Sequence, residues 1–249
     1  MKPLSPRIAA TRLYCDLALS PGAEIALPEG AARHAATVLR LQAGAALSLF
    51  NGAGGEYRSS ILAVNKREVR VRVAEHYASE CESPLDITLA LGISAGERMD
   101  YSLQKATELG VTAIQPLAME RSVVRLAAER AEKRQQHWQH VVIAACEQCG
   151  RNRIPVVAPV QKLYAYLAAV DRNKRLLMLS PQADTPLKRI APAQAAVLLI
   201  GAEGGFAPAE YQAAQSSGFE PVSLGPRILR TETAPVAALA LLQALWGDL

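Results

Sequence analysis

Long hydrophobic runs and cysteine-rich spacings are both missing from this sequence of 249 residues. The most apolar stretch, residues 233–246, contains a glutamine and is shorter than the roughly 20 residues that a helix needs to cross a bilayer. The N-terminal residues lack the apolar segment of a signal peptide. Four cysteines are too few for a disulfide framework in a chain of this length, which fits a reducing compartment. We therefore expect a cytoplasmic protein without a membrane partner.

A strong excess of charge is also missing. The chain has 27 Lys and Arg against 23 Asp and Glu, a formal net charge of +4, and it contains no basic tail or basic block. This balance permits nucleic acid as a partner without indicating it. The chain contains no nucleophile elbow, triad spacing, H-E-x-x-H motif or EF-hand loop, which weakens hydrolase and metalloenzyme interpretations.

The first part of the chain, residues 1–78, is predicted to be a small β-barrel-like domain. Strands are expected at residues 47–50, 57–64 and 68–74, and a short helix at residues 31–41. In residues 69–73, valine and arginine alternate, which is the period of a strand with one solvent-exposed face. The polar segment 78–84 ends in proline and is a plausible linker.

The second part, residues 85–249, alternates apolar strands with helices. This order indicates an α/β domain in which helices cover both faces of a parallel sheet. The expected strands are residues 87–93, 113–117, 175–179, 196–200 and 222–224. The expected helices are residues 99–109, 127–148, 208–217 and 233–246.

The last expected helix, residues 233–246, has almost no polar face. A helix that is apolar all round must be buried all round. A C-terminal helix in a domain of this size is buried most easily at a subunit interface, so we predict a homodimer.

A glycine-rich turn directly follows one of the apolar strands, in LLIGAEGGF (residues 198–206). In α/β sheets ligands bind beyond the carboxyl ends of strands, and glycines let the backbone approach a ligand closely. The turn is neither a G-x-G-x-x-G motif nor a P-loop. Two interpretations remain open: a nucleotide-like ligand held by backbone groups, or a tight strand–helix turn without a ligand.

Two polar segments are further candidates. LGPRILRTET (residues 224–233) leads from a strand end to a helix start, and its arginines and glutamate can steer a polyanion or form a solvated helix cap. EQCGRNR (residues 147–153) ends a long helix. Cys146 and Cys149 form a single C-x-x-C pair there, which we interpret as small buried hydrophobic residues because no second pair completes a zinc site. His137 and His140 similarly lack a third ligand, and we expect no metal.

Five motifs, with an N-terminal segment, carry a resemblance to a known family. They are ERMDYSLQKATELGV (97–111), ERSVV (120–124), CEQCGRNRIP (146–155), LLIGAEGGF (198–206) and LGPRILRTETA (224–234). In this order they resemble the RsmE family of ribosomal RNA small-subunit methyltransferases, which belongs to the SPOUT superfamily. Residues 33–61 are similar to the PUA-like domain of that family.

The resemblance implies transfer of a methyl group from S-adenosylmethionine to N3 of one uridine in the decoding region of 16S rRNA. It implies a PUA-like RNA-binding domain and a homodimeric α/β domain with a deep trefoil knot, which general rules of chain topology would have excluded. No metal is required. The loops of the knot are expected to bind the cofactor through Leu179, Ile200, Gly201, Ala202, Glu203, Gly204, Gly205, Leu224, Gly225, Ile228 and Leu229.

The chemistry requires removal of the imide proton of uridine and stabilisation of the resulting negative charge. Arg230 is the first choice for that charge, because arginine stays protonated and presents a planar fork. Glu203 or Glu232 is expected to orient Arg230 or to accept the proton, with a water or a phosphate oxygen as the alternative base. A phosphate-binding surface is expected from Arg12, His34, Arg40, Arg70, Arg72, Arg98, Lys105, Arg121, Arg151 and Arg153.

One departure from the family pattern concerns the glycine-rich turn. The family usually has G-P-E-G-G, whereas this sequence has Ala202 at the proline position. Proline fixes φ, but alanine can adopt the same φ, so a looser loop and weaker cofactor binding are expected rather than loss of activity. Three alternatives remain: an RNA-binding assembly protein without catalysis, a SPOUT methyltransferase with another target, and a dinucleotide-dependent enzyme.

Overall fold

The computed structural model describes residues 11–65, 68–123 and 128–249. Packing divides the chain into two units. The first contains Met1–Glu82 together with Cys146–Ile154, and the second contains Ser83–Ala145 and Pro155–Leu249. The sequence-based division at residues 78–85 did not anticipate that the polar end of the long helix packs with the N-terminal unit.

The N-terminal unit is a five-stranded sheet in the order β1-β3-β4-β5-β2. Its strands are β1 (Arg12–Tyr14), β2 (Glu24–Ala26), β3 (Ala46–Phe50), β4 (Glu56–Val64) and β5 (Val69–Tyr77). Only β1 and β3 are parallel. Within the described residues no hydrogen bonds join β1 to β2, so the expected barrel is an open sheet by its strand pairing.

The alternation predicted for the third expected strand is confirmed in β5. Val69, Val71 and Val73 are buried, and the two arginines between them are exposed. These valines pack on Leu47 and Leu49 of β3 in one apolar cluster. The expected helix at 31–41 is shorter and has two parts, α1 (Glu29–Arg33) and a π-helix, η1 (His34–Val38).

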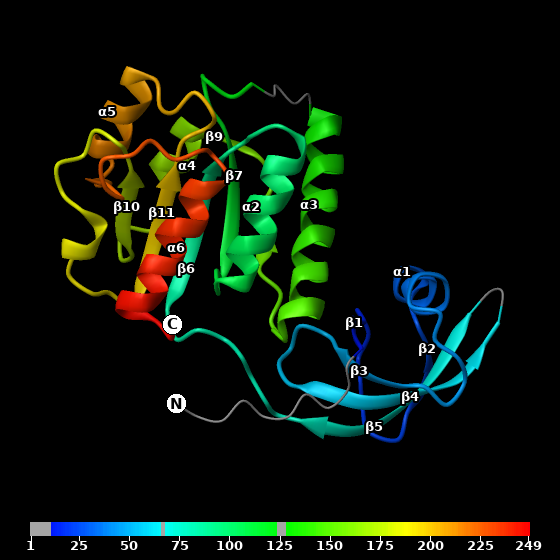
Figure 1. Ribbon diagram of the computed structural model, residues 1–249. Helices are drawn as coiled ribbons and strands as arrows, with labels where there is room; N and C mark the ends of the chain where they lie inside the picture. Colours follow the sequence, from blue (N-terminus) through cyan, green and yellow to red (C-terminus); the bar gives the residue numbers. More distant parts are fainter. Residues whose placement is uncertain (1–10, 66–67, 124–127) are drawn as a thin grey trace. The chain divides into compact units, whose positions relative to one another are not determined.

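The C-terminal unit is a seven-stranded parallel sheet in the order β12-β10-β11-β6-β7-β8, in which β9 also pairs with β7 (Figure 1). Its strands are β6 (Asp86–Gly92), β7 (Ala113–Ala118), β8 (Val156–Val157), β9 (Gln161–Lys162), β10 (Arg175–Leu179), β11 (Ala195–Ile200) and β12 (Glu220–Val222). The helices are α2 (Gly96–Glu108), α3 (Ala128–Cys149), α4 (Leu163–Ala169), α5 (Pro208–Ser216), α6 (Thr233–Trp246) and a 3-10 turn, η2 (Leu187–Arg189). The predicted helix start at residue 127 lies outside the described residues.

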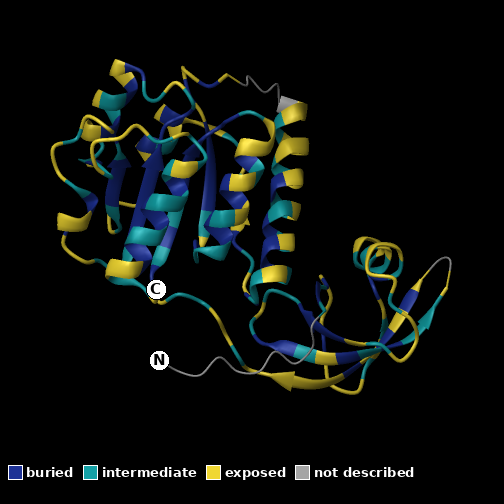
Figure 2. Cartoon of the chain, in the orientation of Figure 1, coloured by how far each residue is buried: buried dark blue, intermediate teal, exposed yellow. Residues whose placement is uncertain are grey.

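Helices cover both faces of this sheet, as the near-continuous apolar strands predicted. Val197 and Leu199 of β11 pack in one cluster with Leu163 of α4 and Ala214 of α5. Because neighbouring strand residues point to opposite faces, Leu198 faces the other side, where α2 and α6 lie next to each other (Figure 1). Figure 2 shows the longer strands of this sheet, β6, β7, β10 and β11, as mostly buried. The α/β class is therefore confirmed.

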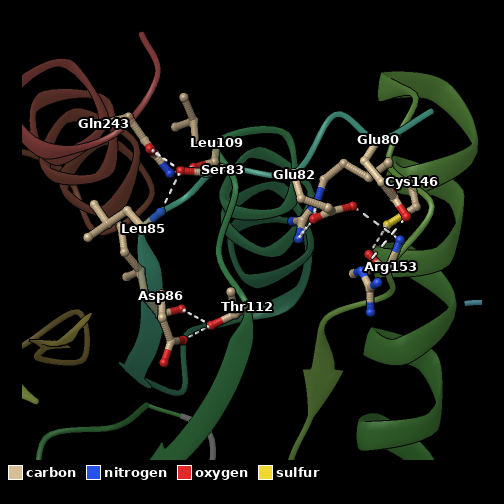
Figure 3. A network of polar contacts seen from close by, with 12 residues as sticks. Glu80, Glu82, Ser83, Leu85, Asp86, Leu109, Thr112, Cys146, Arg153 and Gln243 are labelled. Carbon is tan, nitrogen blue, oxygen red and sulfur yellow. Dashed lines mark hydrogen bonds and ion pairs between the residues drawn. The ribbon is translucent and has the colours of Figure 1, made fainter. Parts of the chain in front are cut away.

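A buried amide joins three elements of this unit (Figure 3). Gln243 of α6 is 1% exposed and donates to the carbonyl oxygen of Leu109 at the end of α2 (2.8 Å). Its Oε1 accepts a hydrogen bond from the Ser83 hydroxyl (2.7 Å), which precedes β6. Polar atoms buried in this way need partners, so the network fixes where the chain enters the sheet.

Candidate functional site

Three segments of the chain leave the sheet at the same edge. Strands β10, β11 and β12 are parallel, with Leu179 opposite Ile200 on one side and Val222 on the other. The residues that follow these three strands are consequently neighbours at the carboxyl edge, the place where parallel α/β sheets bind ligands.

These segments line a cavity of about 620 Å³ in the C-terminal unit. All the residues expected to bind the cofactor contribute to its wall: Leu179, Ile200, Gly201, Ala202, Glu203, Gly204, Gly205, Leu224, Gly225, Ile228 and Leu229. The size is within the range of about 300–1,000 Å³ typical of ligand pockets. The cavity brings together the two glycine-bearing turns, as the resemblance implied.

The glycine-rich turn after β11 is packed too tightly for side chains at two positions. A Cβ on Gly201 would lie 3.0 Å from the carbonyl carbon of Gly205, and a Cβ on Gly204 would lie 2.8 Å from the Cβ of Arg121. The turn is closed by a hydrogen bond from the N–H of Gly205 to the oxygen of Ala202 (2.8 Å). Ala202 itself is 4% exposed.

The three residues expected to be catalytic, Arg230, Glu203 and Glu232, all line the cavity. Oε1 of Glu203 accepts hydrogen bonds from the N–H of Ala95 (3.1 Å) and from Nη1 of Arg98 (3.0 Å). Glu232 lies 4.0 Å from Nε of the same arginine. Within the described residues, Arg230 has no ion-pair partner.

Two arginines expected to contact RNA, Arg98 and Arg121, line this cavity. Arg98 pairs with the two glutamates, and Nη1 of Arg121 donates to the carbonyl oxygen of Gly204 (3.2 Å). Three further wall residues, Gln182, Phe206 and Tyr211, have no role in the sequence analysis, and Arg227 appears there only as one of the two arginines of its motif. Arg227 lies inside a quoted motif and Gln182 follows a strand end, so their positions carried a signal.

From the sequence, Arg12 and Arg151 are expected on an exposed phosphate-binding surface, but both side chains are buried. They are 6% and 4% exposed within the N-terminal unit. Nε of Arg12 donates to Glu56 (2.9 Å), and its other nitrogens donate to Asn152 and to backbone oxygens. Arg151 pairs with Glu82 (2.6 Å). Their internal partners give these arginines a structural role that their sequence context did not reveal.

The remaining basic residues of that list differ in their partners. In the N-terminal unit, Arg70 and Arg72 share Glu24, His34 lies 3.7 Å from Glu147, and Arg153 lies 3.8 Å from Glu80. In the C-terminal unit, Lys105 pairs with Glu108 (2.7 Å). Arg40 is exposed and has no ion pair in the described part of the chain, and its φ of 51° is the only positive value found there outside glycine.

The expectation that Cys146 is a small buried hydrophobic residue is confirmed. It is fully buried, and burial raises the pKa of its thiol to about 12. Its Sγ donates to the carbonyl oxygen of Arg153 (3.8 Å), near the bond from the N–H of Arg153 to Glu82 (Figure 3). Cys149 is only half-buried. The described ranges 11–65, 68–123 and 128–249 contain no group of three His, Cys, Asp or Glu side chains able to hold a metal ion, and no helix there is long and apolar enough to span a membrane.

Comparison with known protein families matches both units. Residues 81–243 match the RNA methyltransferase domain, and residues 27–74 match the RNA methyltransferase PUA domain. The ribosomal RNA small subunit methyltransferase E of Buchnera aphidicola (from Schizaphis graminum) is 35% identical over 96% of this chain and 97% of its own. The Synechocystis protein of the same name is 37% identical over 84% of this chain and 69% of its own.

Solved structures agree with this result. A ribosomal RNA small subunit methyltransferase E from Neisseria gonorrhoeae, bound to S-adenosylmethionine, has a TM-score of 0.89 and 42% identity, covering 96% of this chain and 98% of its own. A Legionella pneumophila methyltransferase in complex with the same cofactor has a TM-score of 0.92 and 41% identity, covering 96% and 99%. The chain therefore belongs to the RNA methyltransferase family that includes ribosomal RNA small subunit methyltransferase E.

Proposed function

We propose that this protein transfers a methyl group from S-adenosylmethionine to N3 of a uridine in the decoding region of 16S rRNA, in the bacterial cytoplasm. The single observation that carries the proposal is the cavity at the carboxyl edge of β10, β11 and β12, which gathers both glycine-bearing motifs. The proposal is also supported by the solved structures of two relatives with more than 40% identity, both of which contain bound S-adenosylmethionine. The uridine atom and the position in 16S rRNA rest on the resemblance of the motifs.

The residues of the cavity fit the cofactor. A Cβ on Gly205 or Gly225 would meet no other atom within 4 Å, so these two glycines leave open space along the wall. Leu179, Ile200 and Leu224 supply apolar surface for an adenine ring, and the turn 201–205 supplies backbone groups at close range. We assign these residues to holding the cofactor, whose sulfonium supplies the methyl group when it is bound.

Arg230 is the group we assign to the negative charge of the deprotonated uridine. It lines the cavity, and no carboxylate among the described residues competes for its guanidinium. Arginine stays protonated at neutral pH and can donate two parallel hydrogen bonds to a developing oxyanion. The position of Arg230, two residues before Glu232, brings an acceptor for the imide proton to the same segment.

Glu232 fits the proton acceptor better than Glu203 does. Both oxygens of Glu203 are engaged or enclosed: Oε1 accepts two hydrogen bonds, and Oε2 is buried without a partner in the described residues. The side chain of Glu232 is 22% exposed, and its only ion contact in the described part of the chain is at 4.0 Å. We therefore keep Glu232 as the candidate base and assign Glu203 to the support of the turn.

We also propose a homodimer formed through α6. Pro235, Ala238, Leu239 and Leu242 form the buried face of this helix, whereas the apolar side chains on its other side, Ala237, Ala240 and Leu241, are only half-buried, and Leu245 near its end is 42% exposed. The apolar sequence of the helix thus extends beyond what its own chain covers. Size-exclusion chromatography with light scattering should give twice the chain mass, and a monomeric mass would contradict this proposal.

The trefoil knot belongs to the proposal as well. The segment after β10 bonds to the segment after β12: the N–H of Leu187 donates to Ser223, and the N–H of Ser223 donates to Thr185. These bonds support close passage of two loops that the resemblance assigns to the knot.

Among the N-terminal residues expected to contact RNA, the exposed Arg40 is the best-supported phosphate contact, because its charge has no ion pair in the described residues. Affinity for RNA should then fall steeply as salt rises.

The test is methyl transfer from tritiated S-adenosylmethionine to small subunits purified from a strain that lacks the endogenous enzyme, followed by nucleoside analysis. Label in 3-methyluridine of 16S rRNA is the expected result, and Arg230→Met should abolish it while cofactor affinity persists. Cofactor binding with label in another nucleoside would contradict the proposed target. Absence of both binding and transfer would favour a non-catalytic RNA-binding protein.

A further inference from the structure

Arg98 connects three segments around the cavity. It lies in the first turns of α2 (Gly96–Glu108), its Nη1 donates to Glu203 in the glycine-rich turn (3.0 Å), and its Nε lies 4.0 Å from Glu232 before α6. The N–H of Ala95, just before α2, donates to the same oxygen of Glu203 (3.1 Å). Two hydrogen bonds therefore join the start of α2 to the turn after β11.

The two carboxylates are enclosed enough to need this partner. The side chain of Glu203 is 13% exposed and that of Glu232 is 22% exposed, whereas that of Arg98 is 54% exposed. Within the described residues Arg98 is the only ion-pair partner of either glutamate. Burying an ionised carboxylate costs free energy unless a cation pairs with it. Loss of Arg98 would therefore favour new ion pairs between these glutamates and other cations nearby.

The nearest alternative cations are in the same wall. Arg227 and Arg230 line the cavity and have no ion pairs in the described part of the chain. Arg230 stands two residues from Glu232 in the sequence. Without Arg98, Glu232 would pair with Arg230. The guanidinium of Arg230 would then be less available to stabilise the negative charge of the substrate in the proposed reaction.

We propose that Arg98 is a positioning residue that neutralises Glu203 and Glu232, so that the cofactor turn keeps its shape and Arg230 stays available to the substrate. This inference rests on the proposed function, and it reassigns a residue whose sequence context suggested an RNA contact. Arg98 acts through the glutamates and touches neither substrate nor cofactor in this role.

A double-mutant cycle tests the assignment. Arg98→Met, Glu203→Gln and the double variant are compared by calorimetry for affinity toward S-adenosylmethionine, which does not depend on methyl transfer. Arg98→Met should weaken cofactor binding about tenfold, but only about threefold or less when Glu203 is already Gln. Arg98→Lys should recover part of the cofactor affinity lost in Arg98→Met. Thermal melting should confirm that each variant is folded. Arg189→Met, an exposed arginine outside the cavity wall, is the matched control and should match the wild type.

Steady-state kinetics on small subunits complete the test. The positioning role predicts that Arg98→Met lowers kcat and leaves KM for small subunits, and its salt dependence, unchanged. A higher KM, with a salt slope reduced by about one and unchanged cofactor affinity, would mean a phosphate contact and overturn the proposal. Equal effects of Arg98→Met with and without Glu203 would overturn it as well. If the wild type transfers no methyl group, the proposed function fails, while the calorimetric cycle still decides the role of Arg98.

Discussion

Gly92, the last residue of β6, allows the glycine-rich turn to pack directly on the sheet. A Cβ at this position would lie 2.4 Å from the nitrogen and 2.8 Å from the Cα of Ala202, and 2.7 Å from the sulfur of Met119. Ordinary van der Waals contact begins at 3.4 Å. Gly92→Ala therefore has to displace the backbone of Ala202 by about 1 Å, because a main-chain atom cannot rotate away as a flexible side chain does.

The displaced atoms belong to the wall of the cofactor cavity, so binding should suffer more than folding. Overpacking of this kind costs about 1–3 kcal/mol, which corresponds to a fall in Tm of roughly 2–12 °C for a unit of this size. A shift of about 1 Å in a site that positions reactants costs on the order of 100-fold in activity. We expect Gly92→Ala to stay folded and to lose most of its affinity for S-adenosylmethionine.

Calorimetry and thermal melting measure the two effects separately. Gly30→Ala is the matched control: a Cβ there meets nothing within 4 Å, and alanine should stabilise α1 slightly. Adding Met119→Ala to Gly92→Ala relieves the contact with sulfur and leaves the clash with Ala202, so it should not restore binding. Wild-type affinity in Gly92→Ala, or full rescue by Met119→Ala, would refute the argument from backbone contact.

Three further predictions concern buried groups. Arg12→Met should destabilise the N-terminal unit by about 3–5 kcal/mol in urea unfolding, because it leaves Glu56 buried without its partner; a loss below 1 kcal/mol would mean that the ion pair is dispensable. At pH 8 a maleimide should label the exposed Cys81 quickly and leave Cys146 unlabelled until the protein unfolds, because a thiol with a pKa of about 12 stays protonated at that pH; rapid labelling of Cys146 in the folded state, located by peptide mass mapping, would contradict this. Ala202→Pro should tighten cofactor binding by a few-fold, because a fixed φ stiffens the turn that lines the cavity; weaker binding in calorimetry would show that loss of the N–H that pairs Ala202 with Gly205 outweighs this gain.

The fold could be predicted where the hydrophobic period extends over several residues. The C-terminal helix was predicted at residues 233–246 and is observed as α6 (Thr233–Trp246). Strand β12, predicted at residues 222–224, lies at Glu220–Val222 instead. The strand includes Pro221, which costs little there because β12 is at the edge of the sheet.

Short elements were missed for a physical reason. Strands β1, β2, β8 and β9 have two or three residues each, too few to display a period of two. Their hydrogen bonds come from neighbours distant in the sequence, such as β3 for β1. The π-helix at His34–Val38 also has no counterpart in the sequence-based prediction of a single helix at residues 31–41.

The ion-pair partners of the arginines could not be predicted from the sequence. From the sequence, Arg12 and Arg98 are both expected to contribute to one phosphate-binding surface. Their actual partners, Glu56 for the first and Glu203 for the second, lie 44 and 105 positions away. A sequence shows every basic residue but not its partner. An arginine whose guanidinium is already paired with a carboxylate is less available to bind a phosphate. By that measure Arg40 becomes the strongest candidate among the N-terminal residues expected to contact RNA, although its sequence context does not distinguish it from the others.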